Sequence, residues 1–182
     1  MTLRIPPVTF DNAPEASKPL LAGIQQAFGK VPELFATIGH SPVVLDSLLA
    51  WDHAMTHSSL SLREIELLNL HISELNGCGY CLAAHEAFAK HKGLSLRDLE
   101  RARNGLGADA REDALLALAR RVVRTGGSRA GGEVAQAREA GVSDATIIDV
   151  LAMVALKTFT NAVALVAQTR VDFPKAPRSP QD

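Results

Sequence analysis

The chain has 182 residues, and its 19 basic and 20 acidic side chains leave a formal net charge of −1. A chain of this length can bury one core of its own, and its near-neutral charge gives no electrostatic reason to expect nucleic acid or an anionic membrane surface as a partner. The opening stretch from Met1 to Pro7 lacks a continuous apolar run, so we expect no secretory signal and a cytoplasmic location.

The proline pattern divides the chain into three stretches. Residues 1–17 contain three prolines and no periodic pattern, which predicts an extended N-terminal arm placed to lie over a neighbouring subunit. Residues 18–172 carry the periodic apolar patterns of a helical domain. Residues 173–182 again contain three prolines and are predicted to form a loosely held tail.

Helix signals recur along the middle stretch. Apolar residues at helical spacing run from Lys18 to a stop at Gly29, and Ser61 followed by Glu64 is a capping-box signature that predicts the start of a helix. Further starts are indicated at Pro32, Pro42, Ser95, Asp109, Glu133 and Ser143. No stretch of strand length alternates apolar and polar residues with β-branched enrichment, so the predicted fold class is all-α.

The longest apolar run, Ile147 to Ala167, is long enough to span a bilayer but contains Asp149, Lys157 and Asn161. Charged and amide side chains in the middle of such a run argue against a membrane helix. We therefore expect a helix that is buried on more than one side, and a contact between subunits accounts for burial beyond what one domain provides.

Both cysteines lie in one short segment, Cys78-Gly-Tyr-Cys81, and His85 follows four residues later. In a helix these three side chains project within about 60° of one another, so a dithiol and an imidazole share a face. Asn76-Gly77 is a poor helix interior, which places Cys78 in the first turn of a new helix, where free N–H groups favour thiolate over thiol. In a reducing compartment such a pair is more often catalytic or metal-binding than a structural crosslink.

The spacing of Glu66, Cys78, Cys81 and His85 resembles that of the alkylhydroperoxidase AhpD-like branch of the carboxymuconolactone decarboxylase family. The resemblance extends over most of the chain through shorter flanking pieces: Phe28–Phe35, Ser41-Pro42, Phe159–Asn161 and Val171–Pro174. It implies a compact helical domain of AhpD-like type that forms homo-oligomers, either trimers or hexamers.

The resemblance also implies a reaction and its residues. Cys81 would attack a hydroperoxide substrate, Cys78 would resolve the oxidised Cys81 into a disulfide, and Glu66 with His85 would relay the proton. No bound cofactor or metal is expected. The electron donor would be a lipoyl-type dithiol, carried by a lipoyl domain or another dithiol reductant protein.

Three other interpretations remain open. Two thiolates, His85 and Glu66 could hold Zn²⁺, although structural zinc sites usually draw ligands from two separated pairs. A decarboxylase like those in the family's other branch is the enzymatic alternative, and those relatives generally lack the cysteine pair. The third is a non-enzymatic helical oligomer whose dithiol senses redox state. Tyr80 stands where some relatives carry His, and we expect structural roles for His71, His91, Trp51 and Asn161.

Overall fold

The computed structural model describes residues 3–174 and 176, and every regular element within that range is helical. The all-α prediction is therefore confirmed for the described residues. A short 3-10 helix precedes nine α-helices in this part of the chain: η1 (Glu15–Ser17), α1 (Lys18–Phe28), α2 (Glu33–Ile38), α3 (Pro42–Met55), α4 (Leu62–Leu75), α5 (Gly79–His91), α6 (Leu96–Arg103), α7 (Ala110–Thr125), α8 (Gly131–Glu139) and α9 (Asp144–Ala167).

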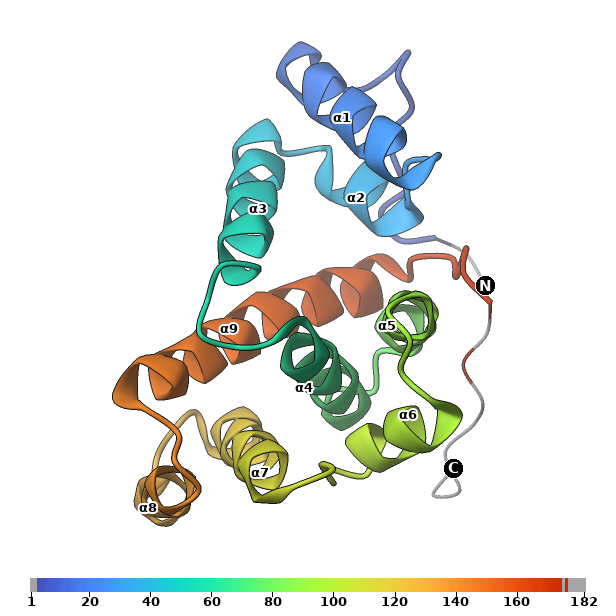
Figure 1. Cartoon of the computed structure of the whole chain (residues 1–182). Coiled ribbons are helices and arrows are strands. Elements are labelled where there is room, and N and C mark those ends of the chain that lie inside the picture. The colour runs from blue at the N-terminus through green and yellow to red at the C-terminus, as the bar shows by residue number, and fades with distance from the viewer. Residues whose placement is uncertain (1–2, 175, 177–182) are drawn as a thin grey trace.

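Helices α4 and α9 form the centre of the domain. Figure 1 shows α9 running across the middle, with α1 to α3 on one side and α4 to α8 on the other. Helix α4 packs against α5, α6, α7 and α9, and every residue from Glu64 to Ser73 is buried. A helix enclosed in this way holds its side chains in fixed positions, including any that serve a functional site.

The helix starts follow the caps that the sequence predicts. The hydroxyl of Ser61 accepts a hydrogen bond from the Glu64 N–H, and the Glu64 carboxylate accepts one from the Ser61 N–H at 2.7 Å, which completes the capping box. Ser95, Asp109 and Ser143 cap α6, α7 and α9 in the same position. Helix α8 begins at Gly131, two residues before the predicted start at Glu133. No side chain caps this helix, so the sequence carries no local signal for its first residue.

The turn between α4 and α5 lies where the Asn76-Gly77 break predicts it. Gly77 adopts a positive φ of 66°, and the Cys78 N–H donates to the Ser73 carbonyl at 2.9 Å. The chain then reverses, so that α5 packs back against α4. This reversal brings residues of the two helices to one side of the domain.

The N-terminal stretch lies on its own chain. The Arg4 N–H donates to the Ala167 carbonyl at 2.9 Å, the Val8 N–H donates to the Ala36 carbonyl at 3.1 Å, and the Val8 side chain is buried. The described part of the predicted arm thus covers α2 and the end of α9. Most of the predicted tail lies outside the described residues, but Phe173 packs on Tyr80 and is not loosely held, because its ring fits an aromatic cluster.

Helix α9 is long and apolar enough to cross a membrane by length and composition, and half of its most apolar window is buried inside the domain. Its contacts with α4 and α7 account for that apolar character. Part of its surface remains both apolar and exposed: Ile148, Leu151, Phe159, Leu165 and Val166. The predicted subunit contact would lie there, and oligomerisation stays a prediction.

Candidate active site

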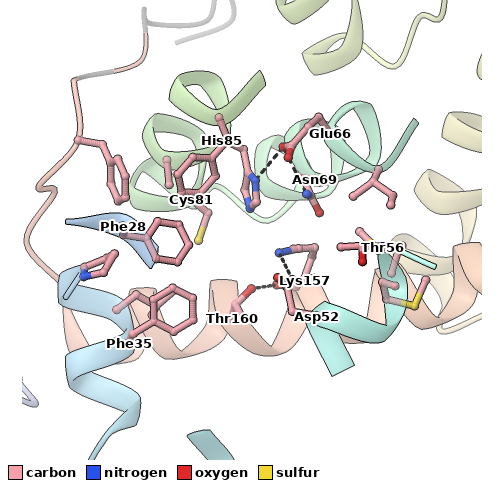
Figure 2. A pocket seen from close by; sticks show the side chains of 18 of the residues that line it. Phe28, Phe35, Asp52, Thr56, Glu66, Asn69, Cys81, His85, Lys157 and Thr160 are labelled. Carbon is pink, nitrogen blue, oxygen red and sulfur yellow. Dashed lines mark hydrogen bonds and ion pairs between the residues drawn. The ribbon is translucent and has the colours of Figure 1, made fainter. Parts of the chain in front are cut away.

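A cavity of about 270 Å³ lies where α4, α5 and α9 meet the N-terminal helices. Its wall is mostly apolar and includes a group of aromatic side chains: Phe28, Phe35, Tyr80, Phe88 and Phe173. Its other side chains include Glu66, Asn69, Cys81, His85 and Lys157 (Figure 2). The exposed residues Asp52, Thr56 and Lys92 also line the cavity, so it reaches the surface.

The two cysteines are joined by a disulfide, with their Cα atoms 5.3 Å apart. Cys81 lines the cavity with His85, whereas Cys78 is only 1 % exposed and is not among the described residues that line it. The expectation that all three side chains share one helix face is wrong for Cys78. Cys78 is the N-cap of α5, with φ −86° and ψ 88°, so its side chain does not follow the helical direction. Its sulfur instead accepts a hydrogen bond from the Cys81 N–H at 3.3 Å.

The α4–α5 packing brings Glu66 into contact with His85. Glu66 Oε2 lies 3.1 Å from His85 Nδ1 and accepts a longer hydrogen bond from Asn69 Nδ2, while Oε1 pairs with Lys92 Nζ at 2.6 Å. Burial opposes ionisation of Glu66, but the hydrogen bond from His85 and the hydrogen bond and positive charge of Lys92 outweigh it and lower its pKa to about 2. Glu66 is therefore a carboxylate over the whole physiological range.

His85 is a neutral imidazole near pH 7. Burial and then the positive charge of Lys157 lower its pKa, and together they outweigh the opposite effect of Glu66. A carboxylate can only accept a hydrogen bond, so the proton of the imidazole is on Nδ1, which donates to Glu66. The other ring nitrogen, Nε2, is left without a proton and points into the cavity (Figure 2). The site thus holds a partly buried base supported by a buried carboxylate.

Sequence reasoning missed the site role of Lys157. This lysine comes from α9, and its Nζ lies 3.7 Å from Asp52 Oδ1 of α3, a residue remote in sequence. The sequence pattern around Lys157 provides only an argument against a membrane helix. The signal that could have identified it is a lysine inside an otherwise apolar helix, because such a charge is costly to bury without a reason.

Tyr80 and Asn161, also singled out from the sequence, form hydrogen bonds between helices. The Tyr80 hydroxyl accepts a hydrogen bond from the Leu34 N–H at 3.2 Å, and burial raises its pKa, so it ties α2 to α5. Asn161 is buried and bridges α9 to α4 through Asn76 and Ser73. His91 is exposed at the edge of the cavity. Among the described residues, no group of three or more His, Cys, Asp or Glu side chains converges to hold a metal ion.

Residues 42–125 match the model of the carboxymuconolactone decarboxylase family. This range contains Glu66, Cys78, Cys81 and His85. None of the curated proteins matches the chain.

Solved structures share the fold over nearly the whole chain. The structure described as an alkylhydroperoxidase AhpD core, an uncharacterized peroxidase-related protein from Ralstonia eutropha JMP134, is 22% identical with a TM-score of 0.83, covering 93% of this chain and 92% of its own. An uncharacterized peroxidase-related protein from Silicibacter sp. TM1040 is 22% identical with a TM-score of 0.79, covering 92% of each chain. A variant of the debrominase Bmp8, in complex with 2,3,4-tribromopyrrole, is 16% identical with a TM-score of 0.78, covering 94% of this chain and 93% of its own.

The helical architecture and the cavity at the α4–α5 packing define an all-helical protein with the AhpD-like fold. Residues 42–125, a little under half of the chain, match the family model, and the chain as a whole is similar in fold to AhpD-like proteins. At these identities the solved structures establish the fold and leave the reaction to be argued from the site.

Proposed function

We propose that this protein is a thiol-dependent peroxidase that reduces hydroperoxides through Cys78 and Cys81. One observation carries the proposal: the Cys81 sulfur and the proton-free nitrogen of His85 share a cavity in which Glu66 holds the other nitrogen at 3.1 Å. A thiol, a base and a carboxylate that orients the base are the groups that a cysteine nucleophile requires. The two peroxidase-related proteins of the same fold are consistent with this chemistry.

The first step forms a sulfenic acid. In the reduced protein the Cys81 thiol gives its proton to His85 Nε2, and the thiolate attacks the terminal oxygen of the hydroperoxide. The O–O bond breaks, Cys81 becomes Cys–SOH, and the departing alkoxide takes the proton from the imidazolium to leave as an alcohol. The Glu66 carboxylate stabilises the imidazolium while it exists.

The proton transfer matters more than activation of the sulfur. Lowering a thiol pKa from near 8.5 to about 6 raises its thiolate fraction at pH 7 roughly thirtyfold, but the accompanying loss of nucleophilicity is roughly tenfold. The net gain in the rate of attack by the thiol is therefore only a few-fold. An unprotonated oxyanion is a poor leaving group, so delivery of a proton by His85 supplies the larger part of the rate enhancement.

The second step closes the disulfide. Cys78 attacks the Cys81 sulfenic acid, water leaves, and the disulfide present in the structure forms. A lipoyl-type dithiol then attacks the Cys81 sulfur from the cavity and releases Cys78 as a thiolate. The reductant's second thiol displaces Cys81, so that the reductant becomes the disulfide and both cysteines are reduced. The N-terminus of α5 stabilises the Cys78 thiolate, which makes it the better leaving group.

The direct test is consumption of an organic hydroperoxide with dihydrolipoamide as donor. We expect turnover by the wild type and none above background by Cys81→Ser. Cys78→Ser is the matched control: in the absence of the dithiol donor it should consume about one equivalent of hydroperoxide and remain a sulfenic acid that dimedone traps, because no second thiol of the subunit resolves it. Full turnover by Cys81→Ser would discard the assignment.

Other reactions on this fold are separated by the same variants. The family includes decarboxylases, and the debrominase shares the fold. Release of CO₂ from a lactone acid by Cys81→Ser would favour the decarboxylase alternative. Loss of assembly on oxidation, without peroxidase turnover, would favour a redox-sensing oligomer. A cytoplasmic location and the lipoyl-carrying partner stay predictions.

A further inference from the structure

The cavity contains a buried cation that the proposed mechanism does not use as a proton carrier. Lys157 is 6% exposed and comes from the middle of the apolar helix α9. Its ammonium group faces the cavity on the side opposite the aromatic cluster (Figure 2). Because an ammonium group loses its hydration when it is buried, a site that keeps one there needs an anion to balance it.

The protein itself supplies only a weak counter-charge. Lys157 Nζ lies 3.7 Å from Asp52 Oδ1, which is beyond hydrogen-bond distance, and the Asp52 side chain is 57% exposed to solvent. The described residues provide no hydrogen bond to Nζ. Lys92 provides the contrast, because its ammonium group pairs with Glu66 at 2.6 Å. Lys157 therefore has hydrogen-bond donors available for a molecule in the cavity.

The opposite wall suits an apolar body. Phe28, Phe35, Phe88 and Phe173 form a chain of ring contacts with centroids 5.5 to 5.9 Å apart. The cavity of about 270 Å³ is close to the lower limit of ordinary ligand pockets, which hold about 300–1,000 Å³. It holds one ring or a short branched chain, and a longer molecule would extend out of it.

We propose that Lys157 is an anion-binding subsite, and that the substrates are small hydroperoxides with an aromatic or branched apolar body and a carboxylate. The inference rests on the proposed peroxidase function and specifies its substrate class. The carboxylate binds Lys157 Nζ in competition with Asp52, and the ring lies against the phenylalanines. His85 lies between the Lys157 and Cys81 parts of the wall, so the hydroperoxide group reaches the sulfur and the base together (Figure 2).

The kinetic test compares two substrates that differ only in the anion: cumene hydroperoxide and its 4-carboxy derivative. We expect wild type to prefer the carboxylate by about tenfold or more in kcat/KM, mainly through a lower KM, and Lys157→Met to lose that preference. The preference is the ratio of kcat/KM for the two substrates, so a change in the activity of His85 that affects both substrates alike cancels. Lys90→Met is the matched control, because Lys90 is an exposed lysine of α5 outside the cavity. Equal preference in wild type and Lys157→Met would overturn the proposal.

A binding test separates the subsite from the peroxidase reaction. Calorimetry should detect binding of 4-isopropylbenzoate to the oxidised wild type. The uncharged 4-isopropylbenzamide should bind about tenfold more weakly, and Lys157→Met should bind the two molecules equally. Asp52→Asn keeps the lysine and should strengthen benzoate binding several-fold, which tests the idea even where Lys157→Met does not fold. Benzoate binding without any hydroperoxide turnover would refute the proposed function and leave the subsite. Turnover with benzoate affinity unchanged in both variants would refute the subsite alone.

Discussion

Two histidines on neighbouring helices, the buried His71 of α4 and the partly buried His85 of α5, occupy very different surroundings. Burial lowers the pKa of both, to about 4 for His71. His85 contacts the Glu66 carboxylate and turns its other nitrogen toward a cavity. His71 faces the chain after α6: its Nδ1 lies 3.3 Å from the Arg103 carbonyl, and its Nε2 has no hydrogen-bond partner among the described residues.

The region around His71 is closed by packing. A Cβ added to Gly105 would lie 2.7 Å from His71 Cε1, so only glycine lets the chain pass the ring. The comparison shows that a buried, neutral imidazole with a depressed pKa does not by itself mark a site. The additional features at His85 are a carboxylate partner and an open nitrogen.

The largest expected difference between the two regions is in turnover. His85→Asn removes the base that moves the proton, so we expect kcat for cumene hydroperoxide to fall about thousandfold, within the range of about 10²–10⁴ that general acid–base groups contribute. His71→Gln should keep kcat within about twofold, because His71 has no route to the cavity. Steady-state assays with dihydrolipoamide measure both. Similar losses in the two variants would show that burial, and not the carboxylate and the cavity, distinguishes functional histidines here.

Glu66→Gln removes the charge behind His85 and leaves a group of similar shape. We expect kcat to fall about hundredfold, because the imidazolium formed during the reaction loses its partner. Activity requires unprotonated Nε2, so it declines as pH falls through the pKa of His85. Glu66 raises that pKa, and its removal should move this acid limb to lower pH. The pH dependence of kcat/KM measures the shift, and a limb that moves to higher pH would contradict the assigned role.

Local signals predicted much of this comparison. The caps at Ser61, Ser95 and Ser143 and the break at Gly77 depend on a few adjacent residues, so they could be identified before any tertiary contact was known. The four-residue spacing from Cys81 to His85 lies within one helix and likewise needs only helix geometry. Helix geometry therefore predicts that Cys81 and His85 lie near each other, and the site role of His85 and the structural role of His71 stay predictions.

The rest of the site depends on distant parts of the chain. The Glu66–His85 contact requires the crossing of α4 and α5, and the Lys157–Asp52 pair requires α9 beside α3. The aromatic wall joins Phe28 near the N-terminus to Phe173 near the C-terminus through Phe88. No sequence period relates such residues, so neither the cavity nor its cation could be predicted from spacing.

The next effect is on stability and concerns His71. The unfolded chain protonates this histidine below about pH 6.5 and the folded chain only near pH 4, so falling pH favours unfolding between these values. We expect the contribution of His71 to the free energy of unfolding to be fully present above pH 6.5. By pH 4.5 this contribution should have fallen by about 2–3 kcal/mol. Urea unfolding at pH 7.5 and 4.5 gives the change in unfolding free energy with pH for wild type and for His71→Gln. The difference between the two changes is the contribution of His71. Identical pH dependences would mean that His71 titrates alike in both states.

The smallest expected effect tests whether contact with the cavity is enough to make a residue functional. Tyr80 lies between the cysteines and lines the cavity, yet its hydroxyl accepts a hydrogen bond from the Leu34 N–H at 3.2 Å. Tyr80→Phe leaves that buried N–H without a partner, so we expect unfolding free energy to fall by about 1 kcal/mol while kcat stays within about twofold. Urea unfolding and the peroxidase assay measure the two quantities. A large loss of kcat at unchanged stability would mean that the phenol takes part in proton transfer, and Tyr80 would then belong with His85 and not with His71.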